Sequence, residues 1–223
     1  MRARSRSPIH WLSQAVLVFL LAGPPAFAAD APKKDASKKE AAVAPAAAAA
    51  DKAKAAQEAA MAEMMKYAKP GPMHALLDPL VGTWKTVNRS WMGPGGPTVS
   101  EGTCERTWLM GGRFLQSKYS GMFQSMPFEG MEILGYDMKK KEYSSVWIDN
   151  MGTMLSVSTG GQSDPAGKVI TVNSSFDDPT TGKLVPYRMV TKIIDNNSHT
   201  FSMIGTNDGK DYTQMEITYA RVK

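Results

Sequence analysis

The most constraining feature of the chain is a series of about ten short, strand-like segments after residue 82, each bounded by turn-forming residues. Glycine pairs and Asn/Asp-Gly sequences separate them, as at Gly111-Gly112 and Asn207-Asp208-Gly209, and such sequences are typical of β-hairpin turns. No connection is long enough for a crossover helix, which excludes a doubly wound α/β fold. The segments are approximately 83–91, 98–110, 113–123, 128–136, 142–150, 153–161, 168–176, 183–195, 199–206 and 210–222.

Short connections throughout this region favour pairing between consecutive strands. The pattern fits either a closed meander barrel or a β-sandwich, and closure has the advantage that it removes exposed sheet edges. We therefore predict an all-β fold, an antiparallel up-and-down barrel of about ten strands. The leucine-rich segment 72–81 predicts a short helix, interrupted at Pro79, ahead of the first strand.

The N-terminus has the features of an export signal. Three arginines precede an apolar segment at 11–21, and Ala26-Phe27-Ala28 is a small-x-small cleavage site. We expect a signal peptide over 1–28 that is cleaved after Ala28. The mature protein is expected to have no transmembrane span and to reside in the periplasm or outside the cell. The alternative is an uncleaved membrane anchor, for which the apolar segment is short.

Residues 29–69 are predicted to form a linker, because alanine and lysine dominate and large apolar side chains are almost absent. Pro32 and Pro45 are expected to break regular structure, whereas 51–67 has a helix-forming composition. The methionines near the end of that helix form a weak apolar stripe. This stripe is consistent either with a marginal helix beside the domain or with a helix that docks on an envelope partner.

The charge distribution excludes nucleic acid as an expected partner. The net charge of the whole chain is +5, but residues 70–223 carry 15 basic and 15 acidic side chains. A neutral domain lacks the positive surface that binding to a phosphate backbone requires. The single cysteine, Cys104, cannot form an intramolecular disulfide.

A Gly-x-Trp sequence at Gly82-Thr83-Trp84 follows the predicted helix, and Arg221 lies near the end of the last strand. In both respects the domain 70–223 resembles the calycin (lipocalin-like) barrels, and this resemblance implies that Arg221 packs on Trp84 to close the barrel. The domain also resembles a bacterial family known as domain of unknown function 1579, which implies a calycin-like barrel and no established activity. The motifs that carry this resemblance are PGPMHALLDPLVGTW (70–84), WMGPGGP (91–97), GGRFLQ (111–116), MPFEG (126–130), LGYD (134–137), VWIDNMGT (146–153), FDDPTTGK (176–183) and MEITYARVK (215–223).

Strand alternation identifies candidate residues for the barrel interior. Several predicted strand faces combine aromatic side chains with a few charges, and such a mixture is typical of a small-molecule pocket. The competing interpretation is that these tryptophans only pack and that the charges are solvated or paired. The candidate cavity lining comprises Arg106, Trp108, Tyr119, Glu132, Trp147, Asp149 and Arg188.

The sequence predicts no cofactor, and haem is the one alternative considered. Some calycin-like barrels bind haem through one histidine, and here His199 or His74 would be the axial ligand. No cluster has the spacing of a catalytic zinc site, and no Gly-x-Ser-x-Gly nucleophile elbow is present, so no catalytic residue is assigned.

These observations lead to three functional hypotheses. The first is a binding module that holds a small, partly apolar ligand in the barrel, with Arg106 or Arg188 pairing an acidic group. The second is a structural or interaction protein of the cell envelope, with a filled barrel and with the 29–69 arm as its tether. The third is an enzyme, which would require a carboxylate or histidine of strongly perturbed pKa inside the cavity.

Overall fold

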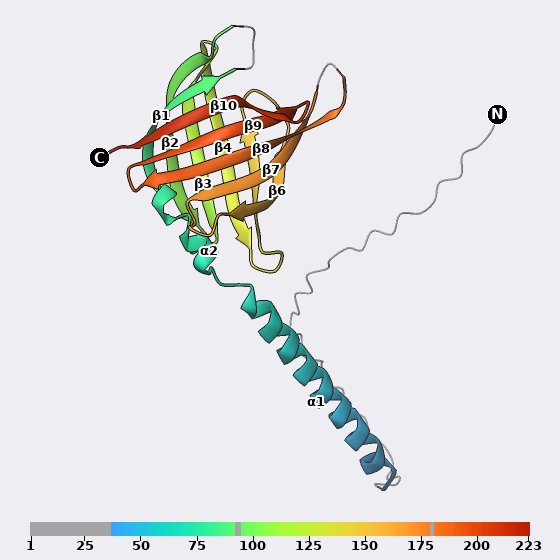
Figure 1. Ribbon diagram of the computed structural model, residues 1–223. Helices are drawn as coiled ribbons and strands as arrows, with labels where there is room; N and C mark the ends of the chain where they lie inside the picture. The colour runs from blue at the N-terminus through green and yellow to red at the C-terminus, as the bar shows by residue number, and fades with distance from the viewer. Residues whose placement is uncertain (1–36, 92–94, 179–180) are drawn as a thin grey trace, which may run out of the picture. The chain divides into compact units, whose positions relative to one another are not determined.

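The computed structural model describes residues 37–91, 95–178 and 181–223, with the backbone alone for 37–47. The chain divides into two units, Met1–Lys52 and Ala53–Lys223, and the second contains the β domain. Its strands curl into a cylinder, with the short helix α2 (Pro72–Ala75) and a 3-10 turn, η1 (Asp78–Leu80), at one end (Figure 1). The predicted signal peptide, with its cleavage site after Ala28, lies outside the described residues.

The predicted barrel is confirmed. Within the described residues ten antiparallel strands form a closed sheet, in which each strand pairs with its neighbours along the chain and the first pairs with the last. Closure rules out the sandwich alternative. The strands are β1 (Gly82–Ser90), β2 (Thr98–Leu109), β3 (Phe114–Phe123), β4 (Met126–Asp137), β5 (Glu142–Asp149), β6 (Ser156–Ser163), β7 (Val169–Asp177), β8 (Leu184–Asp195), β9 (Ser198–Asn207) and β10 (Lys210–Arg221).

Two strands begin more than one residue away from their predicted starts. Met126 and Pro127, which lie between the predicted strands 113–123 and 128–136, belong to β4, and the turn consists of Gln124 and Ser125, whose φ angles are positive. β6 begins at Ser156 rather than near residue 153. The preceding loop is held by Asn150, whose side chain accepts a hydrogen bond from the Glu129 amide and donates one to the Pro127 carbonyl.

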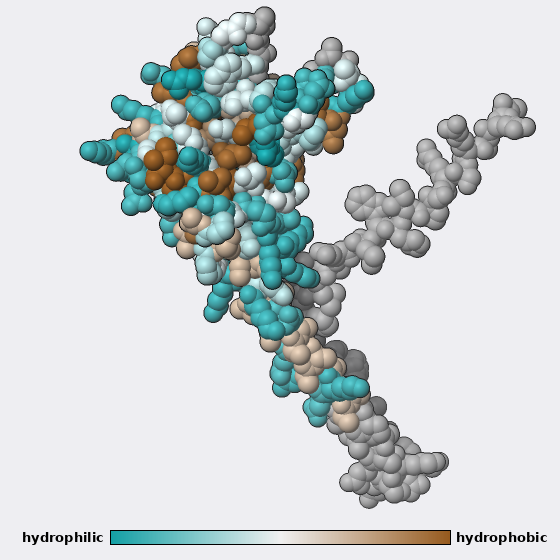
Figure 2. Space-filling view, viewed as in Figure 1, coloured by the Kyte–Doolittle hydropathy of each residue, from teal (hydrophilic) through white to brown (hydrophobic). Residues whose placement is uncertain are grey.

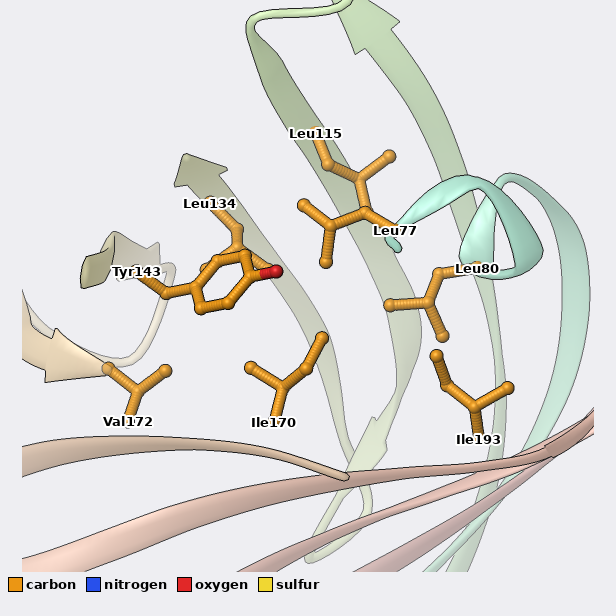
Figure 3. Close-up of a cluster of buried hydrophobic side chains, with 8 residues drawn as sticks. All are labelled: Leu77, Leu80, Leu115, Leu134, Tyr143, Ile170, Val172 and Ile193. Atoms are coloured by element: carbon orange, nitrogen blue, oxygen red, sulfur yellow. The ribbon is translucent and has the colours of Figure 1, made fainter. Parts of the chain in front are cut away.

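One end of the barrel is filled by a hydrophobic core. Leu77 and Leu80 extend from the helical segment into the barrel, where they meet apolar side chains from five strands (Figure 3). We call this cluster the base core. Burying each of these side chains stabilises the fold by roughly 1.5–3 kcal/mol. The helical segment therefore acts as a plug that closes this end of the barrel. The strand residues of the base core are Leu115, Leu134, Tyr143, Ile170, Val172 and Ile193.

The contact that the resemblance implies between Trp84 and Arg221 is present. The Arg221 guanidinium carbon lies 4.1 Å from the centre of the Trp84 ring, and the group donates hydrogen bonds to the carbonyls of Val81 and Pro79. Gly82 makes room for it: a Cβ there would come within 2.3 Å of Arg221 Nη1, and its φ of +128° suits glycine alone. The last strand is thereby tied to the plug.

The helix α1 (Ser37–Lys66) is longer than predicted and passes through Pro45. The expectation that Pro45 breaks regular structure is wrong, because alanines on both sides favour helix strongly enough to continue it. Side chains from 48 to 66 are exposed and alternate between hydrophilic and weakly hydrophobic (Figure 2). No helix within the described residues has the length and apolarity needed to cross a bilayer.

Candidate ligand cavity

The interior of the barrel above the base core is hollow. A cavity of about 370 Å³ is enclosed by side chains from the barrel strands, a volume within the usual range for small-molecule sites. Leu80, Leu115 and Leu134 of the base core form its floor. Met122, Phe128 and Met151 line it near the turns at the other end of the strands, which identifies that end as the mouth.

Five of the seven candidate lining residues border this cavity: Arg106, Tyr119, Glu132, Trp147 and Asp149. They come from β2, β3, β4 and β5, and on β2, β4 and β5 the predicted alternation assigned them to one face. At the mouth, the Asp149 carboxylate accepts hydrogen bonds from Trp147 Nε1 at 2.7 Å and from the Met151 amide at 3.0 Å. Asp149 therefore orients the indole and shapes the adjacent turn.

Trp108 does not line the cavity. It follows Arg106 on the same face of β2, but one step closer to the closed end of the barrel. Its ring packs against the base core and its Nε1 donates a hydrogen bond to Asp78 Oδ1 at 2.9 Å. Trp108 thus helps to hold the plug, because the helical segment already occupies the space into which this part of β2 faces.

Arg188 was assigned to the wrong face of β8. The inward residues of this strand are its odd-numbered ones, among them Tyr187, Met189 and Thr191. Arg188 lies outside, where it forms an exposed ion pair with Asp211. The alternation itself was predicted. Because β8 carries apolar side chains on both faces, the sequence could not show which face points into the barrel.

Polar residues form a continuous row across the cavity wall. In the strand register Arg106 lies opposite Ser117, Ser117 opposite Glu132, and Glu132 opposite Trp147. Inward side chains at directly opposed positions lie about 4.5–5.5 Å apart at Cβ. The row therefore places a guanidinium, a hydroxyl, a carboxyl and an indole side by side, one layer above the leucine floor.

Arg106 is the most deeply embedded charge of the described chain. It is 5% exposed, donates a hydrogen bond from Nη1 to His199 Nε2 at 2.8 Å, and lies 4.7 Å from the centre of the Tyr219 ring. No salt bridge to it appears within the described residues, and its Nε has no hydrogen-bond partner there.

His199 contacts Arg106 inside the barrel but does not line the cavity. Its ring stacks on Tyr219 with centroids 4.0 Å apart and meets the Trp84 ring edge-on at 4.3 Å. Burial, together with the positive charges of Arg106 and Arg221, lowers the pKa of His199 to about 2. The ring is therefore neutral and, because Nε2 accepts from Arg106, its proton sits on Nδ1.

Neither histidine proposed for haem presents a free nitrogen to the cavity. His199 does not line it, and its Nε2 is engaged by Arg106. Nδ1 of His74 accepts a hydrogen bond from the Gly71 amide at 3.1 Å in the turn that starts α2. The haem hypothesis does not fit these residues. Among the described residues, no three His, Cys, Asp or Glu side chains gather as a metal site requires.

Two further groups in the cavity wall have shifted pKa values. Burial raises the pKa of the Glu132 carboxyl, an effect that Arg106 and the hydroxyls of Ser145 and Ser117 partly oppose. Tyr119 donates a hydrogen bond to the Tyr219 hydroxyl at 2.8 Å, and burial also raises its pKa. Burial raises the pKa of Tyr219 as well, so both phenols are neutral at physiological pH.

Sequence reasoning missed the contribution of β9 and β10 to this site. His199, Phe201 and Met203 alternate along β9, and Met215, Ile217 and Tyr219 alternate along β10, so a period of two marked one face of each strand. All of these except His199 line the cavity. Ser117 and Ser145 carried no signal, because serine is common on both faces of a strand.

A solved structure with a TM-score above 0.5 supports the fold. The structure matches "Crystal Structure of Rv2717c from M. tuberculosis" with a TM-score of 0.51 and 17% identity, over 70% of this chain and 100% of that one. "Structure of a redesigned beta barrel, b11L5F_LGL" matches with a TM-score of 0.34 and 14% identity, over 68% of this chain and 96% of that one.

No curated protein matches the chain. The family model described as "Protein of unknown function (DUF1579)" matches residues 69–221, a range that includes the plug and all ten described strands. The chain therefore belongs to the DUF1579 family.

Proposed function

We propose that this protein binds a small, partly apolar molecule inside its barrel, after export through the signal peptide expected at 1–28. The observation that carries the proposal is the hollow interior of about 370 Å³. A core that served stability alone would be close-packed, with few voids larger than a water molecule. A cavity of this size instead resembles the concave, mostly apolar sites that proteins use for small ligands.

The lining of the cavity suits such a ligand. Trp147 lies next to Tyr119 and Phe128, with ring centroids 6.2 and 6.3 Å apart, and these rings offer a rigid apolar wall. Phe201, Met203 and Met215 continue the apolar surface on the other side. Methionine side chains adapt to ligands of varied shape, because they are unbranched and flexible.

The alternative hypotheses have less support. A purely structural protein was expected to have a filled barrel, and the cavity argues against this. An enzyme would need a perturbed acid or base in contact with its substrate. Glu132 qualifies by position, but His199 does not line the cavity and its Nε2 is engaged by Arg106, so the histidine is not placed to act with Glu132 on a bound substrate. The envelope partner proposed for the 29–69 arm remains compatible with ligand binding.

A neutral fluorescent probe tests the proposal. N-phenyl-1-naphthylamine is expected to bind one per chain with a rise in fluorescence. Thr191→Trp, which adds an indole to the cavity wall, is expected to weaken binding at least tenfold, whereas Val190→Trp, the adjacent residue on the outer face of β8, leaves it unchanged. Lack of binding by the parent protein, or equal binding by both variants, would contradict a site inside the barrel.

A further inference from the structure

The cavity wall contains a positive charge without a counter-ion in contact. Burying a charge is costly unless it is paired, and the Arg106 guanidinium interacts with two uncharged groups, the His199 ring and the Cys104 thiol. Beside it, Ser117 is 2% exposed and lies between Arg106 and Glu132 in the strand register. Both residues line the cavity, so a ligand that enters it would meet the Arg106 guanidinium.

No charged side chain among the described residues neutralises Arg106 through direct contact, since most of its neighbours are uncharged. Cys104 on β2, Tyr119 on β3, His199 on β9 and Tyr219 on β10 are uncharged at neutral pH, because burial raises the pKa of the thiol and phenols and lowers that of the imidazole. Asp149 on β5 is held at the mouth by Trp147 and Met151. Glu132 on β4 remains as the one acidic group in the same row.

Resting on the proposed function, we propose that the ligand is an amphipathic acid whose anionic head binds the Arg106 guanidinium just above the cavity floor, with Glu132 taking up a proton as it binds. The apolar part of the ligand then extends past Trp147 toward the methionine-lined mouth. Two carboxylates beside one guanidinium repel each other, and protonation of Glu132 removes this repulsion. The protonated carboxyl also becomes a hydrogen-bond donor to the bound anion.

The direction of the pH effect follows from this competition. Below the pKa of Glu132 its carboxyl is already neutral, and Arg106 is free to pair with the ligand anion. As pH rises through that pKa, ionised Glu132 occupies the field of Arg106 and must be protonated again before the acid binds. The raised pKa of Glu132 supports this mechanism, because it brings the change closer to neutral pH. Affinity for the acid therefore falls with rising pH.

Three probes of equal chain length separate charge from apolar contact: decanoate, 1-decanol and decylamine. Calorimetric titration from about pH 6 upward, where a free carboxylate is ionised, is expected to rank decanoate first and decylamine last. Arg106→Gln is expected to weaken decanoate binding about 10- to 100-fold, the effect of losing a charge-assisted hydrogen bond, with less than about threefold change for 1-decanol. Arg188→Gln, the exposed arginine of β8, is the matched control and is expected to change neither.

Glu132→Gln tests the proton. The parent protein is expected to take up a proton on binding decanoate, seen as a dependence of the heat of binding on the ionisation enthalpy of the buffer. The variant is expected to bind decanoate more tightly at high pH and without proton uptake. Since it retains Arg106, it also serves if Arg106→Gln fails to fold.

Equal affinity of the parent protein for decanoate and 1-decanol would overturn the assignment of an acid, while binding of the neutral probe would leave the proposed function standing. Decanoate binding without proton uptake or pH dependence would overturn the role of Glu132. Failure of the neutral probe and of all three decyl compounds to bind would instead remove the proposed function itself.

Discussion

Replacing Trp84 with alanine is expected to lower the free energy of unfolding by about 3–5 kcal/mol, the usual range for removing a large aromatic side chain from a core. Trp84 has no exposed surface and packs in a cluster with Cys104, Ile217 and Tyr219. Its Nε1 donates to the Leu80 carbonyl at 2.9 Å. The variant leaves a void, an unpaired carbonyl, and an Arg221 that has lost the ring beneath it.

Denaturant and thermal unfolding measure this loss. For a chain of this size it corresponds to a drop of roughly 6–20 °C in Tm. Trp91→Ala is the matched control, because Trp91 is 40% exposed and lies just after β1; we expect it to cost less than about 1 kcal/mol. Similar losses in the two variants would mean that barrel closure does not depend on the contact between Trp84 and Arg221.

Acidification is expected to destabilise the barrel through His199. Its pKa is about 2 in the folded protein against 6.5 when exposed, so below pH 6.5 the unfolded chain binds a proton that the folded chain refuses. The contribution of neutral His199 to the free energy of unfolding is therefore fully present above pH 6.5 and decreases as pH drops. The contribution amounts to about 2 kcal/mol between pH 6.5 and pH 4.5, since one unit of pKa difference corresponds to roughly 1.4 kcal/mol.

Glu132 acts in the opposite sense. Its pKa is raised on folding, so its contribution is present below its ordinary value of 4.5 and is lost as pH rises through the folded pKa. The comparison that isolates the histidine is the parent protein against His199→Gln, whose amide oxygen still accepts from Arg106. The stability difference between the two is expected to shrink by about 2 kcal/mol from pH 6.5 to pH 4.5. Parallel pH curves would show that His199 is protonated without penalty.

The fold was largely predictable because it depends on local signals. Turn residues such as Asp208-Gly209 adopt the positive φ that hairpins require, and they mark strand ends directly. Barrel closure followed from the shortness of the connections. The Gln124-Ser125 turn was missed, because neither residue favours positive φ and the neighbouring Met126-Pro127 pair gives a stronger turn signal.

The site was predictable only in part, because alternation gives two faces without saying which one is inside. On β2 to β5 aromatic residues lie on the same inward face as Arg106 and Glu132. Taking that face as the inner one correctly placed five residues at the cavity. On β8 both faces are partly apolar, so Arg188 was misplaced. The position of Trp108 depends on how far the plug reaches into the barrel, which is a property of packing between distant segments rather than of any local pattern.

Methionine methyl NMR tests the hollow barrel most directly, since methionines line the cavity and also lie on the outside. In protein labelled at the methionine methyl carbon, adding decanoate is expected to shift the signals of Met189, Met203 and Met215, which border the cavity. The signals of Met110 and Met154, each 73% exposed, are expected to stay in place. Shifts confined to the exposed methionines, with the three interior signals unchanged, would contradict a cavity that admits a ligand.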